Sequence, residues 1–474
     1  MTSSNNIPHP PRKPFIGNLP QVMGDETIQQ MINLSAQFDG IFEILLPGAR
    51  FAVVSSAALI EELCDESRFG KFVGGALAEV RNLAGDGLFT AHSHEPNWNK
   101  AHNILAPGFG MKSMKEYLPT MIKIARQLTE KWSRVGINGV NVVDDMTRLT
   151  LETISMCGFD YTFHSFDSEK LHPFLDAMVN TLSESMRRVK RLKVQKYFAF
   201  KANRKFEDDI KFMHSLVDDV INERLKNSEK YKGKLDFLSL MLDGIDRKTG
   251  TKLDYTNIRF QLLTFLIAGH ETTSGMLSFS IYNLIKNPDI LAQAIAEVDS
   301  VLGRDLNRDI TFKDVSDLKL IGRILNESLR LYPTAPAFAV SPQQEQTIGG
   351  KYKFLPGERA LVLTYMLHRD KSVWGENADK FNPDNFLHEN EKLRPSHAYR
   401  PFGNGMRACI GRHFAMVEAT IALAMVLQRF KLEDAWNYKL EIKEALTLKP
   451  NEFILKAIER TDCINLVSRN AAVI

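Results

Sequence analysis

The sequence has few cysteines, little net charge and no long apolar run, and each shortage excludes a class of protein. Its 474 residues hold four cysteines, too widely spaced for a zinc site or a disulfide framework: Cys64, Cys157, Cys409 and Cys463. Such sparse cysteines are typical of a reducing compartment. The net charge of +3, without interleaved basic and aromatic residues, gives no reason to expect nucleic acid as a partner.

A membrane anchor is also missing from the sequence. No run reaches the roughly 18 apolar residues that a bilayer-spanning helix needs. Residues 1–14 form a proline-rich N-terminal segment that holds no apolar signal sequence. We therefore expect a soluble, cytoplasmic protein without a transmembrane anchor.

The interior of the chain has no linker, repeat or low-complexity tract. With 44% apolar residues it can bury a large core. We therefore predict one domain over residues 1–474, with residues 460–474 as a C-terminal tail, although length alone favours about three domains. No Gly-x-Gly-x-x-Gly follows a strand, so this chain is not expected to hold a nicotinamide or flavin site.

Helical periodicity dominates the sequence, so the expected fold class is mainly α with a small β-sheet region. The runs 41–46 and 50–54 flank Pro47-Gly48 and predict a β-hairpin. Residues 359–364 form another strand-like run.

Residues 402–411 carry the most informative motif, with the sequence FGNGMRACIG. Its glycines let the backbone turn tightly and direct amides toward the sulfur of Cys409. A helix expected over about 414–430 would place its positive end beside that sulfur. Both features favour a thiolate that binds a metal. A lone Cys-x-Gly is more often a turn with a buried cysteine, but the whole motif favours the ligand loop.

The pattern Phe-x-x-Gly-x-Arg-x-Cys-x-Gly resembles the haem-binding signature of the cytochrome P450 monooxygenases at every fixed position. The resemblance implies the P450 fold, a triangular helical haem domain that holds haem b (iron protoporphyrin IX) through the thiolate of Cys409. It further implies that Phe402 shields the sulfur, that Gly411 gives its amide to it, and that Arg407 pairs with a haem propionate. A thiolate ligand favours oxidation over oxygen storage.

Glu327 and Arg330 lie three residues apart, on one helical face, where they can pair. Without context such pairs are mostly solvated surface contacts. In the resembling family a buried Glu-x-x-Arg pair braces the cysteine loop, and we assign Glu327 and Arg330 that structural role. The family usually completes the network with Arg or His in a Pro-x-Arg-Phe segment. This chain has Asn385 there, which brings no charge, so the completion of the network stays open.

A long helix is predicted from about Asp254 or Thr256, either of which can cap it, to the break at Asn287-Pro288. Its centre, residues 268–274 (AGHETTS), is a poor helix sequence, and such a local conflict suggests a functional site. A kinked core helix with back-bonded threonines is the alternative. The zinc-protease motif is excluded because its second histidine is missing.

Beside a haem, this helix centre resembles the oxygen-activating groove of the family. The resemblance implies that Glu271 and Thr272 deliver protons during dioxygen activation, and that small Ala268 leaves room above the iron. The departing oxygen must be protonated to leave as water, and an ill-placed proton releases peroxide instead.

A finer match, through Phe69, Lys71 and residues 84–90 and 98–102, resembles the bacterial and fungal self-sufficient fatty-acid hydroxylases, whose haem domain is fused to a flavin reductase. It implies that Phe89 caps the substrate over the iron and that Trp98 donates to a haem propionate. Lys71 and His102 are companions of Arg407 at the cofactor. Core packing is the alternative for Trp98 and Phe89.

The expected substrate is a long-chain fatty acid or a similar apolar chain in a narrow apolar pocket. The residues expected to line it are Leu77, Val80, Phe89, Ile267, Ala268, Ala335, Pro336 and Leu446. The subgroup's Arg and Tyr anchors for the carboxylate align with Ala49 and Val53, and adjacent Arg50 belongs to the other strand face. The basic run 187–196 is a candidate replacement that steers acidic substrates; a solvated helix face is the alternative.

The two electrons must come from outside the chain, because no reductase domain is present. The resemblance implies NADPH, FAD and FMN in a flavin reductase, fused or separate, so the chain is an excised haem domain or a standalone protein. Its docking face is expected around Cys409, with Lys100, Arg407 and Arg412.

The expected activity is insertion of one oxygen atom from dioxygen into an unactivated C–H bond of the substrate. One alternative is a peroxygenase that uses hydrogen peroxide, which would not need the proton relay of Glu271 and Thr272. A non-catalytic haem-thiolate sensor or carrier is another alternative, and it would need neither the relay nor a substrate channel.

Overall fold

The computed structural model describes residues 7–461 except residues 25, 169, 192–194 and 196–197. Several predicted features therefore lie outside the described residues: Cys463, most of the tail 460–474, residues 1–6 of the N-terminal segment, and Lys193 and Lys196 of the basic run. The α-helices are α1 (Thr27–Ser35), α2 (Ala57–Leu63), α3 (Ala76–Ala84), α4 (Pro96–Leu105), α5 (Met111–Val135), α6 (Val142–Phe159), α7 (Pro173–Lys190), α9 (Phe200–Lys226), α10 (Phe237–Asp243), α11 (Tyr255–Lys286), α12 (Pro288–Leu302), α13 (Phe312–Asp317), α14 (Lys319–Leu331), α15 (Thr364–Leu367), α16 (Lys371–Trp374), α17 (His388–Leu393) and α18 (Arg412–Arg429).

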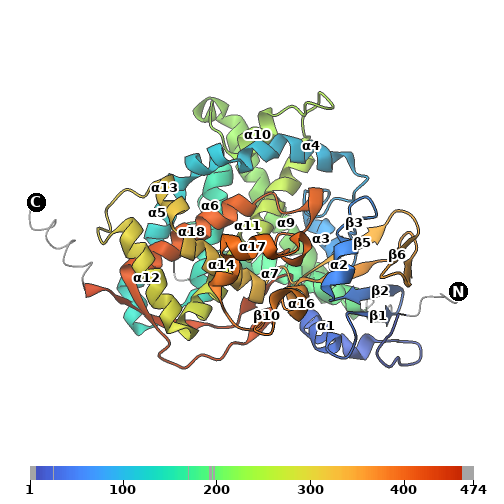
Figure 1. The fold of residues 1–474 in the computed structure, drawn as a ribbon. Coiled ribbons are helices and arrows are strands. Elements are labelled where there is room, and N and C mark those ends of the chain that lie inside the picture. The colour runs from blue at the N-terminus through green and yellow to red at the C-terminus, as the bar shows by residue number, and fades with distance from the viewer. Residues whose placement is uncertain (1–6, 25, 169, 192–194, 196–197, 462–474) are drawn as a thin grey trace, which may run out of the picture.

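The strands are short and form small sheets. They are β1 (Ile41–Leu46), β2 (Ala49–Val54), β3 (Phe69–Lys71), β4 (Val140–Asn141), β5 (Ala337–Pro342), β6 (Gln346–Ile348), β7 (Tyr352–Phe354), β8 (Ala360–Leu363), β9 (Phe430–Glu433), β10 (Ile442–Glu444), β11 (Leu448–Pro450) and β12 (Ile454–Glu459). The largest sheet has the strand order β1-β2-β8-β5-β3. Most of the large sheet's strands lie to one side of the helical body (Figure 1), which confirms the mainly α fold class.

The predicted long helix is α11, continuous over 32 residues. Asp254 caps it, because its side chain accepts the Asn257 N–H at 2.9 Å. The helix ends at Lys286, and Pro288 starts α12 in the first-turn position that proline tolerates. Both predicted ends are therefore confirmed, and the helix crosses the middle of the molecule (Figure 1).

The predicted hairpin is also present. Strands β1 and β2 pair in antiparallel fashion from Ile41↔Val54 to Leu46↔Ala49. Gly48 has φ +82, a backbone conformation that glycine adopts without strain. The third predicted run is β8, which pairs in parallel with β2.

The hydrophobic core has one part between the helices and another on the large β-sheet. One large cluster fills the space between the helices, and two smaller clusters cover the two faces of the large sheet. Side chains alternate along each strand, so Ala360 and Val362 pack on one face while Leu363 packs on the other, together with Met31 of α1 and Phe42. Helix α1 therefore covers the second face.

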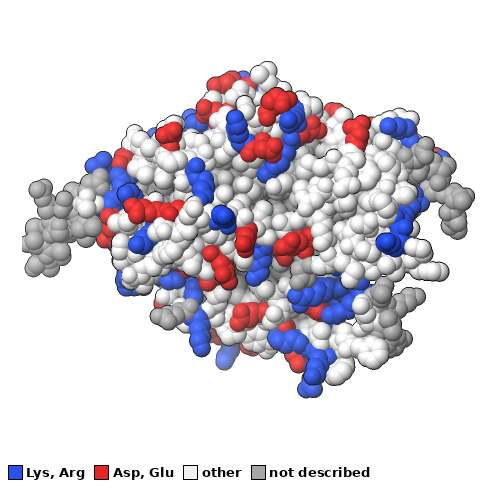
Figure 2. Space-filling view, turned by 90° about the horizontal axis from the view of Figure 1, so that it is seen from below, with Lys and Arg blue, Asp and Glu red and all other residues white. Residues whose placement is uncertain are grey.

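The surface agrees with the small net charge. Figure 2 shows Lys and Arg side chains interspersed with Asp and Glu on one face of the molecule. Within the described part of the chain, no helix is both long enough and apolar enough to cross a bilayer.

Candidate active site

A cavity of about 820 Å³ lies between α11, the 402–411 loop and the large sheet. All but one of the predicted cofactor, catalytic and substrate residues line it: Lys71, Leu77, Phe89, Trp98, His102, Ile267, Ala268, Glu271, Thr272, Ala335, Pro336, Phe402, Arg407, Cys409, Gly411 and Leu446. Val80 is the exception and is a correction. It is fully buried in the main core with Leu83, because α3 packs against α7 and α11.

Cys409 lies in a tight loop just before α18. Its N–H donates to the Phe402 carbonyl at 2.8 Å, which closes the loop. Gly403 and Gly405 have φ +78 and +58, where a side chain would be strained. Cys409 is solvent-accessible and lines the cavity, although protein surrounds its loop. Burial raises the pKa of the Cys409 thiol, while the Gly411 N–H and the charge of Arg412 oppose this. A bound metal would favour the deprotonated thiolate form of Cys409.

Glu66 fixes the same loop, although no sequence motif indicated it. The Met406 N–H donates to Glu66 Oε1 at 2.7 Å. A methyl group placed on Gly405 would lie 1.8 Å from Glu66 Cδ, so a larger residue would displace this carboxylate. Asn404 Nδ2 donates to the Cys64 carbonyl at 2.7 Å and ties the loop to the end of α2. These contacts join residues about 340 positions apart, which sequence spacing does not reveal.

Two cations, Arg407 of the loop and Lys71 of β3, line the cavity. The Arg407 guanidinium lies 4.6 Å from the Trp98 ring centroid and donates to the Ala91 carbonyl at 2.7 Å. Lys71 Nζ donates to the Phe89 carbonyl at 2.6 Å. Burial, and then the charge of Arg407, lowers the pKa of Lys71 to about 7. Among the described residues neither cation forms an ion pair, so the site favours an anion.

Aromatic rings complete this cationic corner. The rings of Trp98 and His102, one helical turn apart on α4, stack with centroids 5.0 Å apart. Burial, and then the charge of Arg407, lowers the pKa of His102. Arg407 lines the cavity and is half-buried, and the docking face expected around Cys409 stays a prediction.

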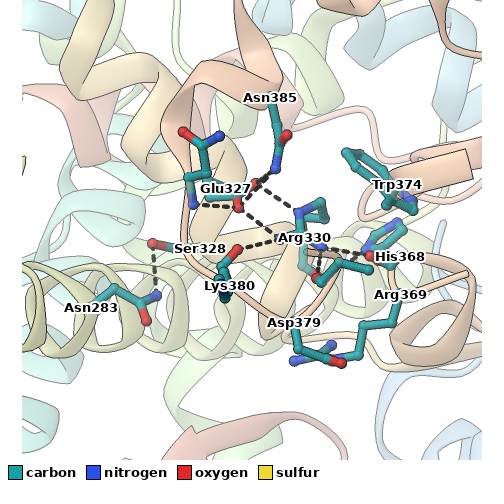
Figure 3. A network of polar contacts seen from close by, with 12 residues as sticks. Asn283, Glu327, Ser328, Arg330, His368, Arg369, Trp374, Asp379, Lys380 and Asn385 are labelled. Carbon is teal, nitrogen blue, oxygen red and sulfur yellow. Dashed lines mark hydrogen bonds and ion pairs between the residues drawn. The ribbon is translucent and has the colours of Figure 1, made fainter. Parts of the chain in front are cut away.

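Glu327 and Arg330 form a fully buried ion pair on α14, both 0% exposed. Arg330 donates to Glu327 through Nε and Nη2, at 2.7 Å each. Its remaining donors bond to the carbonyls of His368 at 2.8 Å, Ala378 at 2.5 Å and Lys380 at 3.0 Å (Figure 3). The guanidinium thus holds together two backbone segments that follow the large sheet, one at His368 and one at residues 378–380.

Asn385 completes this network without a charge. Its Nδ2 donates to both oxygens of Glu327, at 3.1 and 3.3 Å (Figure 3). Arg394 adds a cation close by: Nη2 donates to the Asn385 carbonyl at 2.5 Å, and the guanidinium lies 3.9 Å from the Trp374 ring centroid. Burial lowers the pKa of Arg394, while the charges of Glu391 and Glu327 oppose this. Arg394 therefore supplies the positive charge that Asn385 lacks.

His368 connects the network to the cysteine loop. The Arg400 N–H donates to His368 Nε2 at 2.9 Å, so the ring proton is assigned to Nδ1, which lies 3.2 Å from the Arg330 carbonyl oxygen. Burial, followed by the charges of Arg330 and Arg369, lowers the pKa of His368 to about 3 and keeps the ring neutral. The Gly403 N–H in turn donates to the Arg400 carbonyl at 3.2 Å. A continuous chain of contacts thus runs from α14 to the loop of Cys409.

The centre of α11 faces the cavity from the other side of the loop. The Thr272 hydroxyl donates to the Ala268 carbonyl at 2.8 Å, as the back-bonded alternative predicted, but α11 is unbroken there. Glu271 is buried and accepts from Lys449 Nζ at 2.9 Å and from the Thr447 hydroxyl at 2.8 Å.

Glu271 is held in its ionised form. Burial raises the pKa of Glu271, but the charge of Lys449, the largest opposing cause, and the contact with His270 lower it well below its usual range. His270 Nε2 lies 3.1 Å from Glu271 Oε1. Lys449 and Thr447 belong to the β11 region, and their part in the site could not be read from the α11 motif.

The basic run is largely occupied within the protein. Arg188 pairs with Glu184 at 3.3 Å and with Glu79 at 3.4 Å. Arg191 also pairs with Glu184, and Arg50 pairs with Glu43 at 2.5 Å. The expected role of the basic run 187–196 in steering acidic substrates stays a prediction, because Arg188 and Arg191 are already paired with acidic residues.

The site fits one kind of cofactor. A sulfur atom opens into a cavity, two half-buried cations form no ion pair among the described residues, and the remaining wall is mostly apolar. A flat metal complex with acidic side groups meets all three conditions, because its carboxylates would balance Lys71 and Arg407 while its metal takes the sulfur. The fold and the site therefore define a haem-thiolate protein.

Comparison with known proteins agrees with this class. A family model described as cytochrome P450 matches residues 7–457. The bifunctional cytochrome P450/NADPH-P450 reductase of Bacillus cereus is 49% identical over 461 residues, which are 97% of this chain and 43% of that protein. The bifunctional reductase 1 of Bacillus subtilis is 48% identical over 461 residues, with the same coverage of 97% and 43%. A self-sufficient cytochrome P450 monooxygenase of Phanerodontia chrysosporium is 44% identical over 465 residues, 97% of this chain and 43% of that protein.

The chain belongs to the cytochrome P450 family, and the resemblance read from its motifs is confirmed. It spans less than half the length of these relatives, 43% in each case. The haem-thiolate cofactor follows from the family. The names of the two Bacillus relatives combine a cytochrome P450 with an NADPH-P450 reductase.

Proposed function

We propose that the chain is the haem-binding unit of a monooxygenase that hydroxylates a long-chain fatty acid, or a similar apolar chain, near its tail. It would use dioxygen and two electrons from NADPH, delivered by a flavin reductase that is fused to it or separate. The observation that carries the proposal is the cavity, which brings the sulfur of Cys409, the centre of α11 and a long apolar wall into one space. The names of the relatives, which combine a P450 with a reductase, support the electron source.

The residues of the cationic corner and the loop would hold the cofactor. Haem, when bound, supplies the activation of dioxygen. Cys409 would bind its iron, with Phe402 covering the sulfur and the Gly411 N–H donating to it. The propionates would be held by Lys71, Trp98, His102 and Arg407. Balancing these cations gives the site a second point of attachment besides the sulfur.

The helix α11 would handle protons. The Thr272 hydroxyl lines the cavity and keeps lone pairs that can accept a proton donor. Glu271 lines the same space and is joined through Lys449 and Thr447 to the β11 region. Orderly proton delivery favours release of water over release of peroxide.

The apolar wall would select the substrate. Its lining side chains are Leu77, Phe89, Ile267, Ala335, Pro336 and Leu446. A narrow apolar channel binds a long chain through burial of methylene groups, about 0.8 kcal/mol for each. Phe89 would hold the chain end over the iron.

The test combines binding and turnover of the haem-loaded protein. Long-chain fatty acids should shift the optical spectrum of the ferric haem, and NADPH with a competent flavin reductase should give chain-hydroxylated product. Thr272→Ala should divert most of the dioxygen consumed to peroxide. Equal product yield with hydrogen peroxide alone would favour a peroxygenase, and absence of product with every reductase would favour a sensor or carrier.

A further inference from the structure

Arg359 is a cation in the cavity wall that no sequence motif singled out. It directly precedes β8, lines the cavity and is half-buried. Its guanidinium carbon lies 5.4 Å from the ring centroid of Phe51 and 5.2 Å from that of Phe72. Within the described residues its side chain makes no hydrogen bond or ion pair, and burial alone lowers the pKa of Arg359. A partly desolvated cation without a counter-charge is costly unless a ligand supplies one.

The large sheet directs this side chain toward the cavity. Ala52 pairs with Ala360, and the Ala52 N–H donates to the Arg359 carbonyl at 3.0 Å, which fixes the register. Because side chains alternate along a strand, Arg359 shares its face with Leu361, and both residues line the cavity together with Phe51. Ala360 points to the opposite face and packs in the core.

Two aromatic rings prepare Arg359 for a flat anion. A guanidinium between Phe51 and Phe72 is restrained in orientation while its N–H groups stay available at the edge. A carboxylate is the planar partner that matches this fork with two parallel hydrogen bonds. The guanidinium groups of Arg50 and Arg191 are less suited to bind a carboxylate, since Arg50 is paired with Glu43 and Arg191 with Glu184.

We propose that Arg359 binds the head group of the substrate, a carboxylate at one end of an apolar chain. The chain would run along the apolar wall toward Cys409. Arg359 thus takes the place of the anchors that are missing at Ala49 and Val53, but from β8 instead of the hairpin. This inference rests on the proposed fatty-acid function and adds the residue that determines specificity for acids over neutral chains.

The test compares acids with alcohols of the same chain length. Haem-loaded protein is titrated with each, by the optical shift of the ferric haem and independently by calorimetry. Arg359→Gln should weaken binding of the acid about tenfold to a hundredfold, while binding of the alcohol stays within about twofold. Arg359→Lys should restore part of the affinity for the acid. Arg50→Gln is the matched control, because Arg50 is paired with Glu43 and does not line the cavity, and it should leave the ratio of the two affinities unchanged.

A charge reversal gives a second readout. Arg359→Glu should reject the acid and bind an alkyl chain that ends in a trimethylammonium group, which the aromatic pair also favours. If acids bind to the wild type but Arg359→Gln leaves the preference for them intact, the anchor is elsewhere and this inference is wrong. If the wild type binds neither acids nor alcohols, the proposed substrate class fails instead.

Discussion

Glu271 is a buried carboxylate whose partners lie outside its own helix. Lys449 Nζ and the Thr447 hydroxyl contact its two oxygens at 2.9 and 2.8 Å. A lone buried carboxylate would be protonated, but these partners keep Glu271 charged. The acid of the proposed relay therefore depends on residues that follow it by more than 170 positions.

Removing the charge of Lys449 should change how the site responds to pH. In Lys449→Met the pKa of Glu271 rises, because its largest stabilising charge is gone and burial remains. We expect the yield of hydroxylated product per dioxygen consumed to fall about tenfold at neutral pH and to become pH-dependent there. Lys443→Met is the control, since Lys443 lies opposite Lys449 in the β10–β11 pair but is exposed. A pH profile identical to that of the wild type would show that Lys449 does not tune Glu271.

Glu418 is a second buried acid, with the opposite protonation state. It lies on α18 with 2% exposure. Burial raises the pKa of Glu418 well above its usual value of 4.5, although the contact with Thr153 opposes this. The folded protein therefore keeps a proton that the unfolded chain releases above pH 4.5.

Replacing Glu418 by glutamine should make stability less sensitive to pH. A carboxyl group whose pKa is raised in the folded state makes its full contribution to stability below pH 4.5. As the pH rises above that value, the free energy of unfolding falls by up to ~1.4 kcal/mol for each pH unit. The melting temperature of Glu418→Gln should therefore exceed that of the wild type increasingly from pH 5 to pH 8. Parallel melting curves across this range would contradict a neutral Glu418.

At the scale of elements, α14 supports the cysteine loop through several short segments. Arg330 of the buried pair donates to the His368 carbonyl, and the His368 ring accepts from Arg400, just before the loop. Asn385 and Arg394 close the network on the side of α17. The charge is thus moved from the position usual in the family to a residue nine positions later.

Arg394→Met should loosen this support. The variant loses a hydrogen bond from a charged group and a contact with the Trp374 ring, together about 2 kcal/mol. We expect a lower melting temperature and faster loss of haem, followed by absorbance of the bound cofactor. Asn385→Arg should rescue the Arg394→Met variant by restoring the charge beside Glu327. Lys392→Met, on exposed α17, is the control that should change neither property.

Local patterns predicted the elements well, and long-range contacts escaped them. The bounds of α11 and of the β1–β2 hairpin follow from a capping residue, a proline and a turn that act within a few positions. The contact of Glu66 with the cysteine loop and that of Lys449 with Glu271 join distant segments. Nothing local marks those partners. Val80 was predicted to line the cavity but lies in the main core. Helical spacing shows that one face of α3 is apolar, but it does not show whether another helix or the cavity covers that face.

At the scale of the whole molecule, the cavity is a place where charge is left unbalanced. Lys71 and Arg407 are half-buried and close enough for the charge of Arg407 to act on Lys71. Burial lowers the pKa of Arg407 to about 10 and that of Lys71 to about 7. These cations oppose folding of the haem-free chain and favour the haem-bound one. Cofactor binding and stability should therefore be coupled through charge as well as through the sulfur.

The haem-free protein should become more stable in alkali because of Lys71. Its pKa is 10.5 in the unfolded chain and about 7 in the fold, so the unfolded chain binds more protons between these values and stability rises with pH across that window. Lys71→Met should remove most of this rise while weakening haem binding. The check is the melting temperature of haem-free wild type, Lys71→Met and the control Lys100→Met at pH 7 and pH 9.5, with and without haem. Haem should raise the melting temperature of the wild type more than that of Lys71→Met at pH 7. An equal gain in both would mean that the lysine does not meet the anionic part of the cofactor.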